Sequence, residues 1–343
     1  SPLATQASKL LPYSFGCELE TSNGFIPKHL LGTLGVVPLK DGSLRKETGV
    51  EPYEYTTIPL EGEIGLETLK LLCQELEKRC EFDIKCSMHL HLGGIQRRTE
   101  EFVIALYKLC YNIQDEIFDM FPAYKSYPEK YVAHFHMNYC QKLPNLQLDR
   151  FKFNLIKNNK DAKLLTKQAF DVIYYWLSDN TVSVTDECWN LNTLKHPKGE
   201  MDKWNYLSRY HWINFVPFMF SQKKTVEFRL HTPTFSYIKV SNWLFICAGI
   251  LQFAEQFTNE ILRDEVTYTL DNILDCYTNN FFKSFYETDY SRNMSNYLKQ
   301  YIEFRKQATI KSIEKEDWYG DKTIEFSKDI SFKFETNELK SLF

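Results

Sequence analysis

Three segments of the chain carry a pair of ionisable side chains two residues apart, with one apolar residue between them. The pairs are Glu18 and Glu20, His89 and His91, and Glu227 and Arg229; the residues between them are Leu19, Leu90 and Phe228. On a β-strand, residues i and i+2 point to the same side of the sheet. Each segment is therefore predicted to be a strand whose apolar side faces the core and whose charged side faces away from it.

The spacing of apolar residues elsewhere predicts how these strands are connected. Strands are predicted at 13–20, 50–60, 82–94, 211–220 and 223–234, with a short one near 181–185. Helical spacing predicts helices at about 66–76, 99–119, 161–178 and 239–257, and mostly helical structure over 260–310. This order favours an α+β fold, in which an antiparallel sheet has helices packed on one face.

Composition limits the partners that we expect. Among 343 residues, 41 are Lys or Arg and 45 are Asp or Glu, so the net charge of -4 gives no reason to expect a nucleic acid or an anionic membrane. The longest apolar run, 243–251, is far shorter than the roughly 20 residues of a membrane span. With no basic-then-apolar leader at the start, we expect a soluble, intracellular or cytoplasmic protein.

The nine cysteines support the same expectation. Their number is odd, no C-x-x-C motif occurs, and several lie at positions predicted to be apolar. This pattern favours buried free thiols in a reducing compartment over a disulfide framework or a zinc site.

The charged strand sides could simply be the solvated face of an antiparallel sheet. A solvated face, however, favours Lys, Thr and Ser, whereas these positions hold carboxylates, imidazoles and a guanidinium. Carboxylates facing one another across strands repel unless a cation lies among them, and arginine is suited to phosphate recognition. The pattern therefore predicts a site for a divalent cation and phosphate. Oxygen ligands with one imidazole favour Mg²⁺ or Mn²⁺ over structural zinc.

Other candidate residues have simpler interpretations. His134 and His136 form another i, i+2 pair but have no evident partner, so we expect them to be structural or on the surface. Asp41-Gly42 is typical of a turn. His231 continues the Arg229 side of its strand and could line the same cleft.

Several motifs together resemble one family. The segments that carry the resemblance are SFGCELE (14–20), KDGSL (40–44), EYTTIPLEG (54–62), KCSMHLHLGG (85–94), NYCQKL (138–143) and TVEFRLHTPT (225–234). In order and spacing they are similar to the amidoligase family of glutamine synthetase-like carboxylate–amine ligases. Each motif is short, and their common order from about 13 to 260 carries the resemblance.

The resemblance implies a strongly curved antiparallel sheet and an ATP-dependent reaction that forms an amide or isopeptide bond through an acyl phosphate. The cofactors implied are ATP and Mg²⁺ or Mn²⁺. The partners implied are a carboxylate and an amine, either of which could belong to a peptide or protein. Residues 1–10 are then a tail, 11–262 a catalytic domain with a divergent region at 120–207, and 263–343 a mainly helical extension. Met88 departs from the family, which commonly has a small residue before the first histidine.

The family's metal ligands match positions of this chain. The resemblance implies that Glu18, His89 and Glu227 hold one metal ion, which bridges the phosphates of ATP. It implies that Glu20 and Glu54 hold a second metal ion near the acceptor carboxylate.

The family's other site residues also have counterparts here. Arg229 would contact the transferred phosphoryl group, Arg209 would be a phosphate-binding arginine, and His91 would bind phosphate or substrate. Asp41 would help to bind or deprotonate the amine. Asn214 faces the site if its strand pairs with residues 225–230. Two other functions remain open from the sequence: a catalytically inactive interaction module that retains the fold, and a metal-dependent amide hydrolase.

Overall fold

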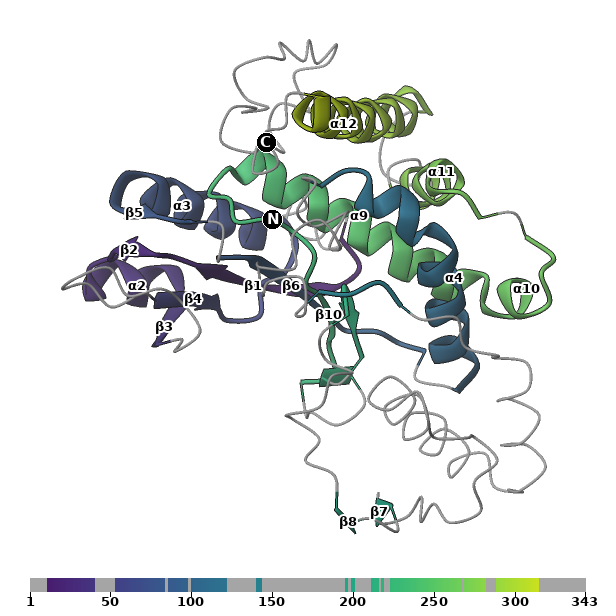
Figure 1. The fold of residues 1–343 in the computed structure, drawn as a ribbon, viewed down its shortest axis with the longest axis horizontal. Helices are drawn as coiled ribbons and strands as arrows, with labels where there is room; N and C mark the ends of the chain where they lie inside the picture. Colours follow the sequence, from purple (N-terminus) through teal and green to yellow (C-terminus); the bar gives the residue numbers. More distant parts are fainter. Residues whose placement is uncertain are drawn as a thin grey trace.

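The centre of the protein is a six-stranded antiparallel sheet with helices packed over one face (Figure 1). The computed structural model describes residues 11–40, 53–83, 86–97, 100–121, 140–143, 195–196, 199–200, 211–215, 217–218, 223–266, 268–281 and 288–314. Within them the chain is an α+β fold, which confirms the predicted class.

The strands follow an order in space that differs from their order in sequence. From one edge to the other, the sheet contains β3 (Val36–Lys40), β4 (Tyr53–Thr57), β1 (Ser14–Glu20), β6 (Met88–Gly93), β10 (Val226–Phe228) and β9 (Ile213–Asn214). Two small ladders pair β2 (Asn23–Gly24) with β5 (Cys80–Glu81), and β7 (Lys195–His196) with β8 (Gly199–Glu200). The central position of β1 places it between strands that come from distant parts of the chain.

The helices lie mainly on one side of this sheet. They are α2 (Lys28–Leu34), α3 (Gly62–Arg79), α4 (Glu100–Phe118), α9 (Tyr237–Gln256), α10 (Thr258–Leu262), α11 (Leu270–Phe281) and α12 (Thr288–Glu314). Figure 1 shows α3 and α9 running above the strands, with α12 beyond them. The apolar side of the central strands, including Leu19 and Leu90, is fully buried toward the core.

Helix α9 is the most buried of these elements. It contacts α3, α4, α10, α11 and α12, so side chains around its whole circumference are covered. Its length and apolar composition would suit a membrane span, but 89% of its apolar window is buried inside the fold. An all-round apolar helix of this kind is typical of the core of a large domain.

Most predicted elements appear near their expected positions, but the segment 211–220 was wrongly predicted as one strand. Its strand covers only Ile213–Asn214, and residues 217–218 are helical. Pro217 explains the difference, because proline has no N–H for a strand ladder and suits the first turn of a helix. The segments 161–178 and 181–185, and most of 120–207, lie outside the described residues.

Two further elements, α2 and β3, were not predicted. The helix is only seven residues long and ends at Gly35, whose φ of 62° is left-handed. Strand β3 contains Pro38 and forms the sheet edge, where proline is tolerated. None of the eight cysteines among the described residues forms a disulfide bond, which agrees with the prediction of thiols.

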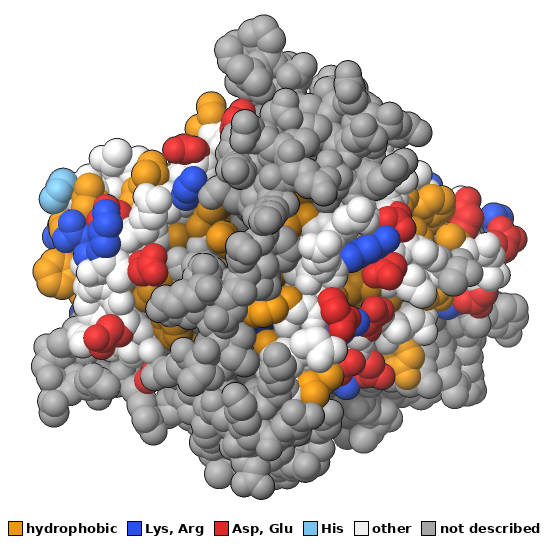
Figure 2. Space-filling view, turned by 90° about the horizontal axis from the view of Figure 1, so that it is seen from above, with side chains coloured by type: hydrophobic (Ala, Val, Ile, Leu, Met, Phe, Trp, Pro, Cys, Tyr) orange, Lys and Arg blue, Asp and Glu red, His pale blue; other side chains and the backbone are white. Residues whose placement is uncertain are grey.

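The surface seen from above the helices carries mixed charge. Figure 2 shows acidic, basic and hydrophobic side chains interspersed on the described part of this face, without an extended area of one sign. The ionisable groups that gather in one place are instead those of the central strands.

Two leucines of α3 test the position of the core. Leu69 is 0% exposed and Leu71 is 44% exposed, although they lie only two residues apart on the same helix. Leu69→Ala should lower the free energy of unfolding by about 2–5 kcal/mol, because it leaves a cavity in a packed interior. Denaturant unfolding would measure this loss.

Leu71→Ala is the matched control and should change stability by less than about 1 kcal/mol, as expected at an exposed position. Equal losses for the two variants would contradict the placement of α3 against the sheet.

Candidate functional site

The pairing of four strands brings the predicted ionisable residues onto one side of the sheet. In the register of β1 and β6, Glu18 lies opposite His89. In the register of β6 and β10, Glu227 lies opposite His91, and Asn214 of β9 lies opposite Glu227. Side chains directly opposite on antiparallel strands share a face, so the site spans β1, β6, β10 and β9.

Glu18 contacts both histidines of β6. Its Oε1 lies 2.9 Å from Nε2 of His91, and its Oε2 lies 3.2 Å from Nδ1 of His89. Each oxygen of this carboxylate therefore meets a different imidazole.

Glu227 approaches the same two rings from the other side. Its Oε1 lies 3.4 Å from Nδ1 of His89 and 4.0 Å from Nε2 of His91. Nη1 of Arg229 donates to Oε1 at 3.2 Å, and Nδ2 of Asn214 donates to Oε2 at 2.6 Å. Glu227 is only 4% exposed, so these contacts hold a buried carboxylate in place.

The electrostatics of the two carboxylates follow from these neighbours. Burial raises the pKa of Glu18, but hydrogen bonds with His89 and His91 outweigh it and hold the pKa well below its ordinary value. Burial also raises the pKa of Glu227, while the charges of Arg229 and the histidines bring it below the ordinary value. Burial lowers the pKa of His91, but the carboxylates of Glu227 and Glu18 raise it above the ordinary value. Both carboxylates are therefore ionised at neutral pH.

Glu20 and Glu54 lie next to this group, directly opposite each other on β1 and β4. The backbone N–H and the hydroxyl of Ser87 donate to Oε2 of Glu20, at 2.7 and 3.0 Å. The hydroxyl of Thr56 donates to Oε1 of Glu54 at 3.1 Å. Burial and the charge of Glu18 raise the pKa of Glu54 to about 7. The strand register thus places the two carboxylates side by side.

The donor atoms suit a divalent cation. One atom from each of Glu18, His91 and Glu227 lies within 4.8 Å of the others. Ligands bound at about 2.1 Å from one metal ion lie about 3.0 Å apart when adjacent and about 4.2 Å apart when opposite. The contacts of both histidines with the carboxylates, from 2.9 to 4.0 Å, fall in this range. Two carboxylates and an imidazole can hold a metal ion here with little movement.

The structure therefore gathers seven of the predicted site residues on one sheet face, with Glu54 beside Glu20. They are Glu18, Glu20, His89, His91, Asn214, Glu227 and Arg229. Asp41 and Arg209 lie outside the described residues, as do His134 and His136.

His231 does not belong to the site. It is 1% exposed, and its ring packs against those of Phe121 and Trp243, at centroid distances of 5.2 and 5.9 Å. The sequence pattern failed here because β10 ends at Phe228, so the alternation of sides does not continue to residue 231.

Two hydroxyl residues of the site were not identified from the sequence. The Ser87 hydroxyl lies 3.0 Å from Nε2 of His89, and the Thr225 hydroxyl lies 3.0 Å from Nδ1 of His91. Ser87 precedes His89 by two residues, and Thr225 precedes Glu227 by two. The same alternation that singled out the ionisable pairs would therefore have found both.

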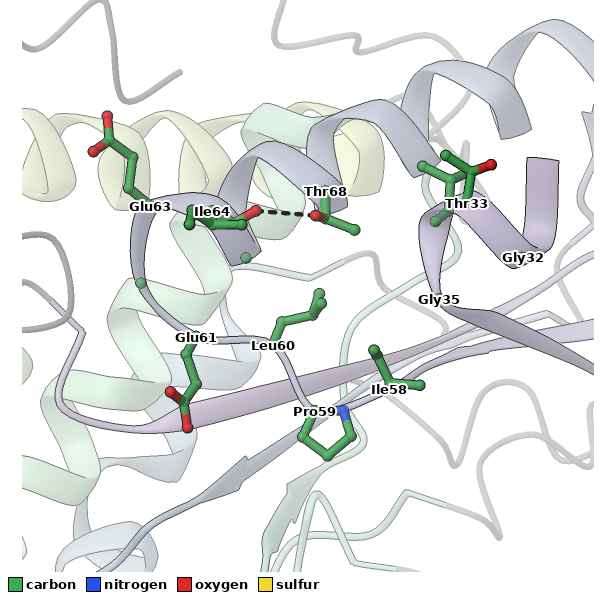
Figure 3. Close-up of a pocket in the computed structure, with 13 residues that line it drawn as sticks. Gly32, Thr33, Gly35, Ile58, Pro59, Leu60, Glu61, Glu63, Ile64 and Thr68 are labelled. Atoms are coloured by element: carbon green, nitrogen blue, oxygen red, sulfur yellow. Dashed lines mark hydrogen bonds between the residues drawn. The ribbon is translucent and has the colours of Figure 1, made fainter. Parts of the chain in front are cut away.

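A cavity of about 610 Å³ lies away from this group (Figure 3). It is bounded by the end of α2, the segment after β4 and the first turn of α3, including Gly35, Leu60 and Gly65. Leu60 pairs with Phe15 near the start of β1, whereas the site is formed by the end of that strand. The cavity and the ionisable cluster are thus separate features.

Comparison with known proteins does not extend the resemblance. No family model matches the chain, and no curated protein matches its sequence significantly. The likeness to amidoligases remains a prediction from the motifs.

Glu54 allows a test of the site's electrostatics in metal-free protein. The carboxyl ionises near pH 7 in the folded chain, against an ordinary value of 4.5. Between these pH values the folded chain binds more protons than the unfolded chain, so stability falls as pH rises. We expect Glu54→Gln to remove this part of the pH dependence. Urea unfolding at a series of pH values, with a chelator present, would measure it.

Glu67→Gln, at an exposed position of α3, should keep the pH dependence of the wild type. If Glu54→Gln also keeps it, the burial of Glu54 beside Glu18 is wrong.

Proposed function

We propose that the protein is an ATP-dependent ligase that joins a carboxylate to an amine through an acyl phosphate. The observation that carries this proposal is the group formed by Glu18, His89, His91, Glu227 and Arg229 on one sheet face. It combines ligands for a cation with a guanidinium suited to phosphate, as phosphoryl transfer requires. The proposed fold is the curved sheet of the glutamine synthetase-like ligases.

The chemistry explains why such residues are needed together. A carboxylate anion is a poor electrophile, so it must first receive a phosphoryl group, and an amine can then displace phosphate. Phosphoryl transfer depends mainly on positioning and on neutralising charge. Mg²⁺ or Mn²⁺, when bound, supplies part of that neutralisation.

Within this proposal, the residues of the chain have separate tasks. Glu18 and Glu227, with histidine nitrogens, hold the cation that accompanies the nucleotide. Glu20 and Glu54, which lie opposite each other, would hold a second cation near the acceptor carboxylate. Arg229 orients the transferred phosphoryl group.

The position of Arg229 is already fixed by its neighbours. Its Nη1 is hydrogen-bonded to Glu227, and its backbone N–H donates to the carbonyl of Trp212 at 2.8 Å. A planar guanidinium held in this way presents a fork of donors in a defined direction. Holding the fork before substrate binds reduces the ordering needed at the moment of transfer.

Substitutions at two positions test the function. Glu18→Gln keeps the shape of the side chain but removes its charge, and Arg229→Ala removes the guanidinium. Each should reduce amine-dependent phosphate release from ATP by at least about 100-fold, the loss seen when a group that stabilises transition-state charge is removed. The measurement is phosphate release with Mg²⁺ and a panel of carboxylates and amines.

Glu67→Gln and Arg263→Ala are controls of matching type, since Glu67 is exposed on α3 and Arg263 is in an exposed ion pair with Glu265. Both should turn over ATP as the wild type does. Unchanged turnover in Glu18→Gln and Arg229→Ala would overturn the assignment of the site. Amide cleavage by the wild type without nucleotide would instead support a metal-dependent hydrolase.

A further inference from the structure

The two histidines of β6 are held in the same way although their rings are turned differently. His89 has Nε2 on the Ser87 hydroxyl and Nδ1 on the carboxylates of Glu18 and Glu227. His91 has Nδ1 on the Thr225 hydroxyl and Nε2 on the same two carboxylates. Each ring thus has one nitrogen fixed by a hydroxyl and the other directed at the carboxylate pair.

The contacts of Ser87 decide which nitrogen of His89 faces the carboxylates. A serine hydroxyl has one hydrogen, and here it is donated to Oε2 of Glu20. The oxygen of Ser87 then accepts from Nε2 of His89, which fixes the orientation of the ring. Nδ1 therefore faces the carboxylate oxygens of Glu18 and Glu227, at 3.2 and 3.4 Å.

Two ionised carboxylates, those of Glu18 and Glu227, meet the same two imidazoles, and Arg229 donates to one of these carboxylates. A cation between the carboxylates would lower their mutual repulsion, and the separations between each imidazole nitrogen and the carboxylate oxygens, from 2.9 to 4.0 Å, match those of ligands around one metal ion. Orienting a ligand histidine through its second nitrogen is also the usual arrangement in metal sites. The Glu20–Ser87 pair does this for His89, and Thr225 does it for His91.

We propose that Ser87 and Thr225 are positioning residues that direct both His89 and His91 at a single cation held by Glu18 and Glu227, so that the site prefers a first-row transition-metal ion to Mg²⁺. Mg²⁺ favours oxygen ligands in octahedral geometry, whereas imidazole suits the transition ions. The inference rests on the proposed function only in placing a cation at these carboxylates, and it requires no nucleotide. Beside the second cation proposed above, it gives Glu20 a further role as the acceptor that holds Ser87.

Mn²⁺ is a suitable probe, because it is the weakest binder of the Mn²⁺-to-Cu²⁺ series and its paramagnetism reports nitrogen ligands. Pulsed electron paramagnetic resonance of the Mn²⁺-loaded full chain should show coupling to two imidazole nitrogens. His89→Gln and His91→Gln should each reduce this to one. Mg²⁺ at equal concentration should leave most of the Mn²⁺ bound.

Titration calorimetry with Mn²⁺ tests the two hydroxyls. Ser87→Ala and Thr225→Val should each weaken binding by roughly 10- to 100-fold, the usual effect of removing a residue that orients a metal ligand. The conservative variants Ser87→Thr and Thr225→Ser keep a hydroxyl and should restore most of the affinity. Thr68→Val removes an exposed hydroxyl of α3 that is hydrogen-bonded only within its helix, and should bind as the wild type does. Circular dichroism would verify that each variant is folded.

Coupling to a single nitrogen, or to none, would overturn the shared site. Wild-type affinity in both Ser87→Ala and Thr225→Val would overturn the positioning role. Two-nitrogen ligation without any ATP turnover would support this inference while counting against the ligase. ATP turnover supported by a cation with one imidazole ligand would support the ligase and count against this inference.

Discussion

Two ionised carboxylates, those of Glu18 and Glu227, lie largely buried near the middle of the sheet, and the rest of the site depends on how this burial is compensated. Removing a charged group from water is costly unless opposite charges and hydrogen bonds replace the lost hydration. His89 and His91 lie against both carboxylates, and Arg229 and Asn214 complete the surroundings of Glu227. A cation would add to the same compensation, which links the stability of this region to its proposed function.

The compensation requires that strands from distant parts of the chain meet in one register. Glu18 faces His89 only because β1 pairs with β6, although the two residues are 71 positions apart. A slip of one residue in any of these pairings would turn the charged side into the core. Burial of the apolar side disfavours such a slip, since Leu19 and Leu90 are covered and Phe228 of β10 packs on Trp243 of α9. The same strand register therefore buries the apolar side chains and brings the ionisable side chains together.

In this site, two hydroxyl groups fix the orientation of the two imidazole rings. Ser87 connects Glu20 to His89, and Thr225 holds His91, so neither ring is free to rotate without losing a hydrogen bond. Ser87 and Thr225 directly precede β6 and β10, which places each hydroxyl near the imidazole that it contacts. They determine which nitrogen of each imidazole meets the carboxylates.

The sequence by itself determined the α+β class, the main strands and helices, and the side of each strand that carries charge, because alternation and helical spacing are local properties. It also predicted that these charged sides belong together. Tertiary structure alone decided the strand order, the opposition of Glu20 and Glu54, and the burial of His231 among aromatic rings. It alone showed that both imidazoles meet the same carboxylates through hydroxyl-held rings. These features depend on register and on where a strand ends, which packing between distant segments sets and no local pattern records.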